Sequence, residues 1–161
     1  MFGASSSLGA PLGGGGGLTE ESSSSSSSFY SFAYPSSWRL NAARGIKVYA
    51  DPADERKNMS VTVIVGQTAF STISDASSAI LTSSRRLDES AQVDARRTRM
   101  TANGAYVVCI RTNQLVYVTT ILNVPSKNRA VVITVQAPAE DSDDATVETT
   151  NAVADSLRAD L

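Results

Sequence analysis

The sequence predicts an α+β domain in which an antiparallel β-sheet of about six strands is flanked by helices, as in an α-β-α sandwich. Short β-branched or aromatic runs follow one another, separated by Gly, Pro and Asn turn residues. Two amphipathic segments accompany these runs, one at 74–89 and one near the C-terminus. Consecutive hairpins with helices at the edges of the pattern indicate antiparallel strands covered by helices.

Residues 1–28 differ in composition from residues 29–161, which are expected to form one folded domain. Gly and Ser make up 17 of the first 28 residues. Such a segment buries too little apolar area to offset its ordering entropy, so we expect either a flexible tail or a segment held by a partner. Its apolar anchors would be Leu8, Leu12 and Leu18. It has neither a secretory signal nor the arginines of a transit peptide, which leaves open whether Met1 begins the full precursor.

The first strand is an aromatic run that ends at a proline. Tyr30, Phe32 and Tyr34 alternate with their neighbours, so they share one face of a strand. Pro35 cannot donate to a sheet ladder and is expected to end the strand. The only tryptophan, Trp38, follows and needs an apolar surface to cover it.

Two strands and a helix come next. Ile46–Ala50 is predicted to be a short strand, closed by Asp51-Pro52. The β-branched run Ser60–Val65 is predicted to be buried on both faces. The segment Ser74–Glu89 is predicted to be a helix, with Ser74 or Asp75 as its N-cap. The apolar face of this helix contains Ala76, Ala79, Ile80, Leu81 and Leu87.

A basic strand and three hairpins complete the predicted sheet. Ala91–Met100 is interpreted as a strand that Asn103-Gly104 joins to Ala105–Arg111 through a two-residue type I′ turn. Thr112–Gln114 and Pro125–Asn128 are the next turns. They lead into strands at Leu115–Val124 and Ala130–Ala137. The final helix follows an acidic run and buries a stripe of Val147, Ala154, Leu157 and Leu161, with Val153 beside it.

The composition excludes several kinds of chemistry. Because the chain has no histidine, Ser-His-Asp and Cys-His arrangements and any zinc site built with imidazole are excluded. The single cysteine, Cys109, cannot form an intramolecular disulfide and is interpreted as a small buried hydrophobe. No apolar run approaches the roughly 20 residues that cross a bilayer. The composition therefore gives little support to a catalytic function.

The charges divide the chain into a basic body and an acidic end. Residues 39–139 hold 13 Arg and Lys against 7 acids, whereas residues 140–161 hold 7 acids against one arginine. The overall acidity argues against nucleic acid as a partner. The segment Arg96–Arg99, together with Arg85 and Arg86, is the densest positive patch. On a strand, Arg97 and Arg99 would share one face and Arg96 would point to the other.

The positive patch has two interpretations. Arg85, Arg86, Arg97 and Arg99 are candidates for docking onto the carboxylates of a partner, which guanidinium groups bind with two hydrogen bonds. The alternative is an edge strand that its charges protect against aggregation. The acidic residues also have two interpretations. Asp141, Asp143 and Asp144 are candidate calcium ligands, but the run lacks the glycine and distal glutamate of an EF-hand loop, and helix capping is the alternative.

Several motifs resemble the PsbP family, the extrinsic lumenal proteins of photosystem II and their relatives. Phe32–Trp38 resembles the family's opening F-x-x-P-x-x-W strand and corner. Val48–Pro52 resembles its second strand, and Asn58–Val61 resembles the N-x-S-V entry to its third. The hairpin at Gly104–Tyr106, the strand Val131–Ala137 and a C-terminal helix follow in the family's order. The resemblance covers about residues 29–161.

The resemblance implies a protein that is not an enzyme and binds no organic cofactor. It also implies a place in the chloroplast thylakoid lumen, peripheral to the membrane and bound to a photosystem core and other extrinsic subunits. Family members with the main role cap the manganese cluster of the oxygen-evolving centre and help to retain calcium and chloride. Retention by this chain would be indirect, because calcium takes several oxygen ligands from whichever chains surround it.

This sequence departs from the family pattern at three points. The hairpin before Ala130–Ala137 is short, the family's histidines are missing, and the N-terminal segment is not basic. These departures leave open a PsbP-like assembly factor. A Ran-binding nuclear import factor family shares the architecture, so an unrelated interaction module is a further alternative. An enzyme would have to use paired carboxylates such as Asp51, Asp54 and Glu55, which are otherwise a solvated turn.

Overall fold

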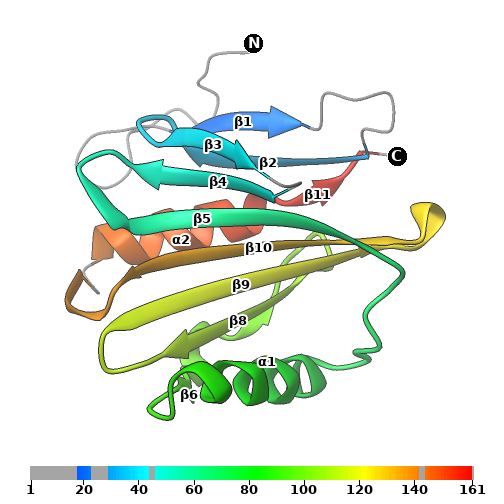
Figure 1. The fold of residues 1–161 in the computed structure, drawn as a ribbon. Helices are drawn as coiled ribbons and strands as arrows, with labels where there is room; N and C mark the ends of the chain where they lie inside the picture. Colours follow the sequence, from blue (N-terminus) through cyan, green and yellow to red (C-terminus); the bar gives the residue numbers. More distant parts are fainter. Residues whose placement is uncertain (1–17, 23–28, 44–45, 142–143, 161) are drawn as a thin grey trace.

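A computed structural model describes residues 18–22, 29–43, 46–141 and 144–160, and it confirms the α+β class (Figure 1). Within these residues there are two antiparallel sheets, one of eight strands and one of three, and two α-helices. The elements are β1 (Leu18–Ser22), β2 (Tyr30–Pro35), β3 (Arg39–Ala43), β4 (Ile46–Asp51), β5 (Asp54–Val65), α1 (Ile73–Leu87), β6 (Gln92–Val93), the 3₁₀ helix η1 (Ala95–Arg97), β7 (Arg99–Met100), β8 (Tyr106–Arg111), β9 (Leu115–Val124), η2 (Pro125–Lys127), β10 (Arg129–Pro138), η3 (Ala139–Asp141), α2 (Asp144–Ser156) and β11 (Arg158–Ala159).

The large sheet has more strands than the sequence predicts. Its order is β3-β4-β5-β10-β9-β8-β6, with β7 also paired to β8. The small sheet has the order β1-β2-β11. The prediction of about six strands missed β1, β3 and β11, because their pairing is provided by tertiary neighbours and not by a local apolar pattern.

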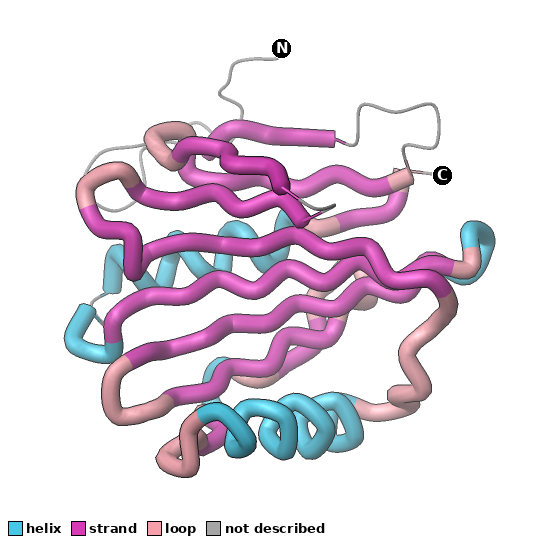
Figure 2. The backbone as a smooth tube through the Cα atoms, in the orientation of Figure 1, coloured by secondary structure: helices cyan, strands magenta, loops and turns pink. Residues whose placement is uncertain are grey.

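The two helices lie on opposite faces of the large sheet, as predicted. Alternate residues of β8 show this directly, because successive side chains of a strand point to opposite faces. Val107 and Cys109 pack in one cluster with Ala154 of α2. Val108 and Ile110 pack in another cluster with Ala76 of α1. In Figure 2 one helix crosses behind the upper strands and the other runs along the lower edge.

The main core lies between the large sheet, β2 and α2. Phe32 is fully buried and meets Tyr49 of β4 edge to face, with ring centroids 5.8 Å apart. The ring of Tyr34 also contacts the ring of Tyr49, with centroids 4.4 Å apart. Trp38 is half-buried and packs on the same cluster, and β2 ends at Pro35 as predicted. The aromatic strand is therefore the centre of the fold, which is what its alternation indicates.

The first helix begins at a different cap from the predicted one, and the buried faces of both helices agree with the prediction only in part. The N-cap of α1 is Thr72, whose Oγ1 accepts from the Asp75 N–H at 3.1 Å, and not Ser74 or Asp75. Leu87, assigned to the apolar face, is 93% exposed. Of the predicted stripe, Ala154 in α2 and Leu157 just after its end are buried, and so is Val153 beside them. Val147 is only half-buried, and Leu161 lies outside the described residues.

The predicted basic strand Ala91–Met100 is wrong. The structure places two short strands there, β6 and β7, separated by η1. The Asp94 carboxylate accepts from the Arg96 N–H at 3.2 Å, and Thr98 Oγ1 donates to the Asp94 carbonyl at 2.9 Å. These local hydrogen bonds pair the Arg96 N–H and the Asp94 carbonyl within a turn, and they therefore favour the turn over a continuous strand.

The turn at Asn103-Gly104 is a longer one than the predicted two-residue type I′ turn. Gly104 has a φ of 87°, but Asn103 is not among the residues with positive φ. The Gly104 N–H donates to the Thr101 carbonyl at 3.0 Å, and the Thr101 N–H donates to the Ala105 carbonyl at 2.9 Å. This is a three-residue loop with glycine in the left-handed position. The Thr101 hydroxyl favours it by accepting from the Ala105 N–H.

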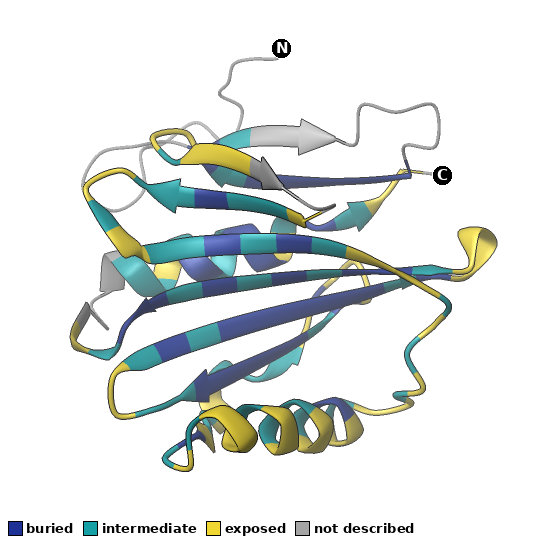
Figure 3. Ribbon diagram, in the orientation of Figure 1, coloured by how far each residue is buried: buried dark blue, intermediate teal, exposed yellow. Residues whose placement is uncertain are grey.

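The run Ser60–Val65 is not buried on both faces. Pairing with β4 stops at Val61, so the end of β5 has only β10 as a described strand neighbour. Val63, Ile64 and Val65 are consequently exposed, by 38%, 43% and 78%. Figure 3 shows the colour of β5 changing from buried to exposed toward this end.

Candidate docking surface

Two arginines of the positive patch are turned inward against α2. The Arg97 guanidinium donates from Nη2 to Thr150 Oγ1 at 2.5 Å, and its Nε is buried with no hydrogen-bond partner among the described residues. Arg99 Nη1 lies 2.7 Å from Asp155 Oδ1 in a salt bridge. The structure thus uses Arg97 and Arg99 to hold η1 and β7 against the acidic C-terminal helix. Whether they also contact a partner stays a prediction.

On the outer side of the same segment, Asp94 forms hydrogen bonds and ion pairs with its neighbours. Its carboxylate is 7% exposed and accepts from Arg111 Nε at 3.1 Å, and Arg96 Nε lies 3.8 Å away. Burial alone would raise the pKa of Asp94. The hydrogen bonds from Arg111 and from the Arg96 backbone N–H, together with the two guanidinium charges, outweigh this effect and hold the pKa below its ordinary value. Asp94 is therefore ionised at neutral pH, and the three side chains carry a net charge of about +1.

Arg96 and Arg111 line a shallow polar hollow of about 460 Å³ at one end of the large sheet. The Arg96 side chain is 90% exposed, whereas the Arg111 side chain is 35% exposed. Ser90 and Asn113 also line the hollow, and Ser90 Oγ accepts a hydrogen bond from the Asn113 N–H at 3.1 Å. Sequence reasoning missed Arg111, which lies 17 positions from Asp94 and meets it only because β6 pairs with β8.

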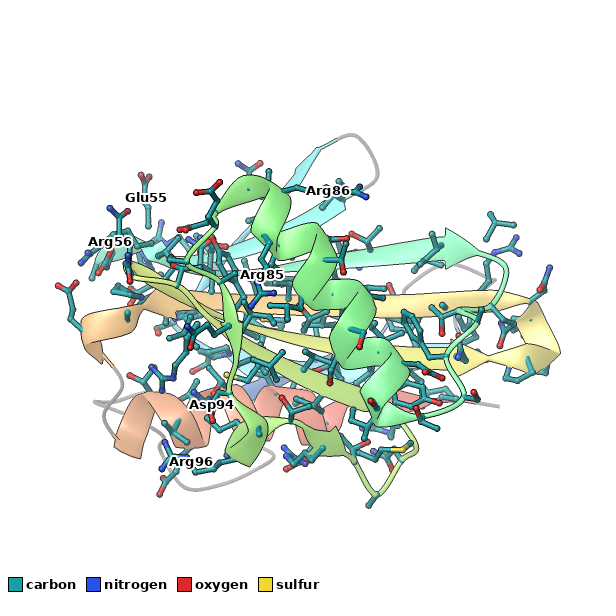
Figure 4. All side chains as sticks on the ribbon, turned by 90° about the horizontal axis from the view of Figure 1, so that it is seen from below. Glu55, Arg56, Arg85, Arg86, Asp94 and Arg96 are labelled. Carbon is teal, nitrogen blue, oxygen red and sulfur yellow. The ribbon has the colours of Figure 1, made fainter. Side chains whose placement is uncertain are left out.

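The two arginines of α1, Arg85 and Arg86, lie in its last turn and point in different directions. Arg85 Nε donates to the Ala91 carbonyl at 3.1 Å, which holds its stem toward the segment that leads to β6. Arg86 is exposed, and Figure 4 shows it on the other side of α1 from Asp94 and Arg96. We use the name arginine strip for Arg85, Arg96 and Arg111 together with Asp94, which contacts Arg96 and Arg111. It contains three guanidinium groups and one carboxylate.

The arginine strip is suited to binding carboxylates. Guanidinium groups are always charged and present their N–H donors in a planar fork that matches a carboxylate. Asp94 accepts hydrogen bonds from Arg111 Nε, which fixes the Arg111 side chain, and from the Arg96 backbone N–H. The Arg96 side chain extends into solvent, and its Nε lies 3.8 Å from the Asp94 carboxylate. A surface of this kind supports recognition of an acidic protein surface, with a binding rate that falls as salt rises.

The predicted leucine anchors are only partly covered by the described residues. Leu18 belongs to β1, is 3% exposed and pairs with Pro35 of β2, so it packs within its own chain. Leu8 and Leu12 lie outside the described residues.

The candidate metal ligands fall at the edge of what is described. Asp143 lies outside the described residues, as do the side chains of Asp141 and Asp144. In the described part of the chain no group of three or more His, Cys, Asp or Glu residues is placed to hold a metal ion. Calcium binding by the acidic run therefore stays a prediction.

The carboxylates of the β4–β5 turn serve local structure. Asp51 Oδ1 accepts from the Ala53 N–H at 2.9 Å, and Asp54 forms a salt bridge with Arg56 at 3.0 Å. Glu55 is exposed and is labelled with Arg56 in Figure 4. These contacts agree with a solvated turn.

Cys109 is a free, buried cysteine, as predicted. Burial raises the pKa of its thiol, so the thiolate form is disfavoured. Among the helices that the structure describes, none has both the length and the apolar character of a membrane span.

No protein-family model matches the chain, and no curated protein sequence matches it. Solved structures, in contrast, do match the chain. The solution structure of cyanobacterial PsbP (CyanoP) from Synechocystis sp. PCC 6803 is 17% identical and covers 98% of each chain with a TM-score of 0.67. The Ran-binding protein Mog1p of Saccharomyces cerevisiae is 9% identical and covers 89% of this chain and 96% of its own, also with a TM-score of 0.67. LpqN, which is involved in cell envelope biogenesis of Mycobacterium tuberculosis, is 11% identical with a TM-score of 0.50. At these identities the likeness shows the fold alone, and this chain has the α+β fold shared by CyanoP and Mog1p.

Proposed function

We propose that this chain is a non-catalytic extrinsic subunit of photosystem II on the lumenal face of the thylakoid membrane. In this role it shields the oxygen-evolving centre from bulk solvent and helps to retain calcium and chloride. The observation that carries the proposal is the end-to-end likeness to cyanobacterial PsbP, which covers 98% of both chains. The motif residues that suggested the same family lie in the core of the fold, as Phe32 and Tyr49 show by their ring contact.

The arginine strip supplies the physical means of attachment in this proposal. A peripheral subunit that covers an ionic centre has to adhere without crossing the membrane and has to exclude water at its contact surface. Exposed guanidinium groups beside a polar hollow can pair with carboxylates of a complex, and the rigid sheet behind them fixes their positions. Ion retention is then indirect, since it comes from covering the site and not from ligands of this chain.

One second candidate has a specific observation in its favour. Mog1p, a Ran-binding protein, has the same TM-score as CyanoP, so an interaction module that binds a GTPase fits the fold equally well. A PsbP-like assembly factor is a variant of the first proposal, in which attachment is transient.

The test is to follow the chain with an antibody through the preparation of photosystem II particles. We expect it to co-migrate with the particles and to be released by a salt wash that leaves the intrinsic subunits in place. An assembly factor would migrate with immature complexes instead. Absence from every photosystem II fraction, together with binding of the purified chain to a Ran-type GTPase, would contradict the proposal and favour the second candidate.

A further inference from the structure

A projecting arm at the far end of the large sheet gathers exposed apolar side chains. The arm consists of the end of β5 (Val63–Val65), the end of β9, η2 and the start of β10, and it forms the tip at the right of Figure 1. The described chain has seven exposed large apolar side chains, and three of them are on the arm. A fourth, Ile46, lies at its base, because the next residue, Lys47, pairs with Val61.

The arm is fixed in place by hydrogen bonds. Gln67 Nε2 donates to the Arg129 carbonyl at 2.7 Å, and the Gly66 N–H donates to the Asn128 carbonyl at 2.8 Å. The Thr68 N–H donates to Asn123 Oδ1 at 2.9 Å. Because the loop after β5 is tied to both other strands, the exposed side chains are held out on a built projection of the sheet.

The charge on the arm has one sign. Residues 62–67 and 121–131 contain Lys127 and Arg129 and no Asp or Glu. Lys127 is exposed at the tip, and Arg129 Nη1 donates to the carbonyls of Lys127 and Asn128 at 3.3 and 3.0 Å, so its guanidinium also lies at the tip. Cations beside aliphatic side chains complement a surface that is anionic on the outside and apolar beneath.

The apolar side chains emerge on both faces of one strand. Val63 and Val65 are on the same face as the buried Val61, and Ile64 points to the opposite face. A rigid protein surface pressed against one face would leave the other face in water, whereas a fluid interface covers both. The edge of β5 beyond its pairing with β4 carries backbone groups that need water, which limits insertion to the depth of the headgroups.

We propose that this arm docks on an anionic lipid surface, with Lys127 and Arg129 against the headgroups and Val63–Val65 between them. The site is separate from the arginine strip and does not depend on a photosystem. It would orient the domain on a membrane and leave the strip free for a protein partner.

Vesicle co-sedimentation of the full chain tests the proposal. We expect the chain to sediment with vesicles of phosphatidylcholine and phosphatidylglycerol, to be released by salt, and not to sediment with phosphatidylcholine alone. Lys127→Gln should weaken binding about fivefold, because each cation near an anionic surface contributes on the order of 1 kcal/mol. Ile64→Asn with Val65→Asn should weaken it further. The control is Leu87→Asn, which removes an even more exposed aliphatic side chain next to Arg86 and should change nothing.

A labelled variant keeps the test independent of these substitutions. Because Cys109 is buried, an environment-sensitive fluorophore can be attached selectively to Val65→Cys or to Leu87→Cys. We expect a blue shift with anionic vesicles for the first and none for the second. The proposal is overturned if the chain does not sediment with anionic vesicles, if Leu87→Asn weakens binding as much as the arm variants, or if the Val65 label shows no blue shift with anionic vesicles.

Discussion

The face of the large sheet that carries α2 and the small sheet is covered far more completely than the face that carries α1. On the first face Phe32, Met59, Ile133 and Leu157 are fully buried in one cluster. On the second, α1 covers β8 and β6, whereas Ile64, on β5, is 43% exposed. The difference indicates that folding stability comes mainly from the α2 face, while the α1 side and the sheet ends leave apolar and charged side chains exposed.

The largest expected effect compares one core residue from each face. Phe32→Ala should lower the free energy of unfolding by about 3–5 kcal/mol, because it removes a fully buried ring that contacts Tyr49. Ile80→Ala, in the half-buried face of α1, should cost only about 1 kcal/mol. Urea unfolding followed by circular dichroism measures both. Equal losses would show that the two faces contribute alike.

The second comparison uses neighbouring arginines that point to opposite sides. Arg97→Ala should lower the free energy of unfolding by about 1–3 kcal/mol, because it leaves Thr150 without its donor and removes a stem packed between α2 and the sheet. Arg96→Ala should stay within about 0.5 kcal/mol, since its side chain is exposed. Arg97→Met separates the two causes, because it keeps an apolar stem and removes the charge. A large loss of unfolding free energy in Arg96→Ala would contradict the different roles given to the two arginines.

A smaller effect is expected at the start of α1. Thr72→Ala should cost about 1 kcal/mol, because the Thr72 hydroxyl satisfies a free N–H of the first helical turn. Ser74→Ala, on an exposed residue inside the helix, is the matched control and should be neutral or slightly stabilising. Thermal unfolding of the two variants distinguishes them, and identical melting temperatures would argue against Thr72 as the cap.

The pH dependence of Asp94 should give the smallest signal. Its pKa is lowered in the folded protein, so its contribution to stability is present above the ordinary value of 3.8 and is lost as the pH falls through the lower folded-state value. The difference in unfolding free energy between the wild type and Asp94→Asn should thus be constant near neutral pH and should shrink below the ordinary aspartate value. A difference that grows on acidification would have the wrong sign.

The sequence was sufficient where the pattern is local. The aromatic alternation from Tyr30 to Tyr34 predicted a core strand, and the apolar run around Cys109 predicted its burial. The sequence was insufficient where contacts between distant segments decide the local structure. The composition of Ala91–Met100 is typical of a strand. In the structure, however, the Asp94 side chain accepts from the Arg96 N–H and stabilises a turn, and Arg97 donates to Thr150 on α2.

The surface was harder to predict than the core for the same reason. Arg96 and Arg111 meet at Asp94 only through the pairing of β6 with β8, so their spacing in the sequence carries no signal. Exposure at the end of β5 depends on where β4 stops pairing. The β-branched run at Val63–Val65 gives no sign of that limit.

Rebinding of the purified chain to photosystem II membranes stripped of extrinsic subunits tests the central claim most directly. We expect saturable binding by the wild type, with an affinity that falls as salt rises. Arg85→Glu with Arg96→Glu should weaken binding at least about tenfold, whereas Arg39→Glu, an exposed arginine on β3, should leave it unchanged. If the wild type does not bind, or if the double variant binds as tightly as the wild type, docking through the arginine strip is wrong.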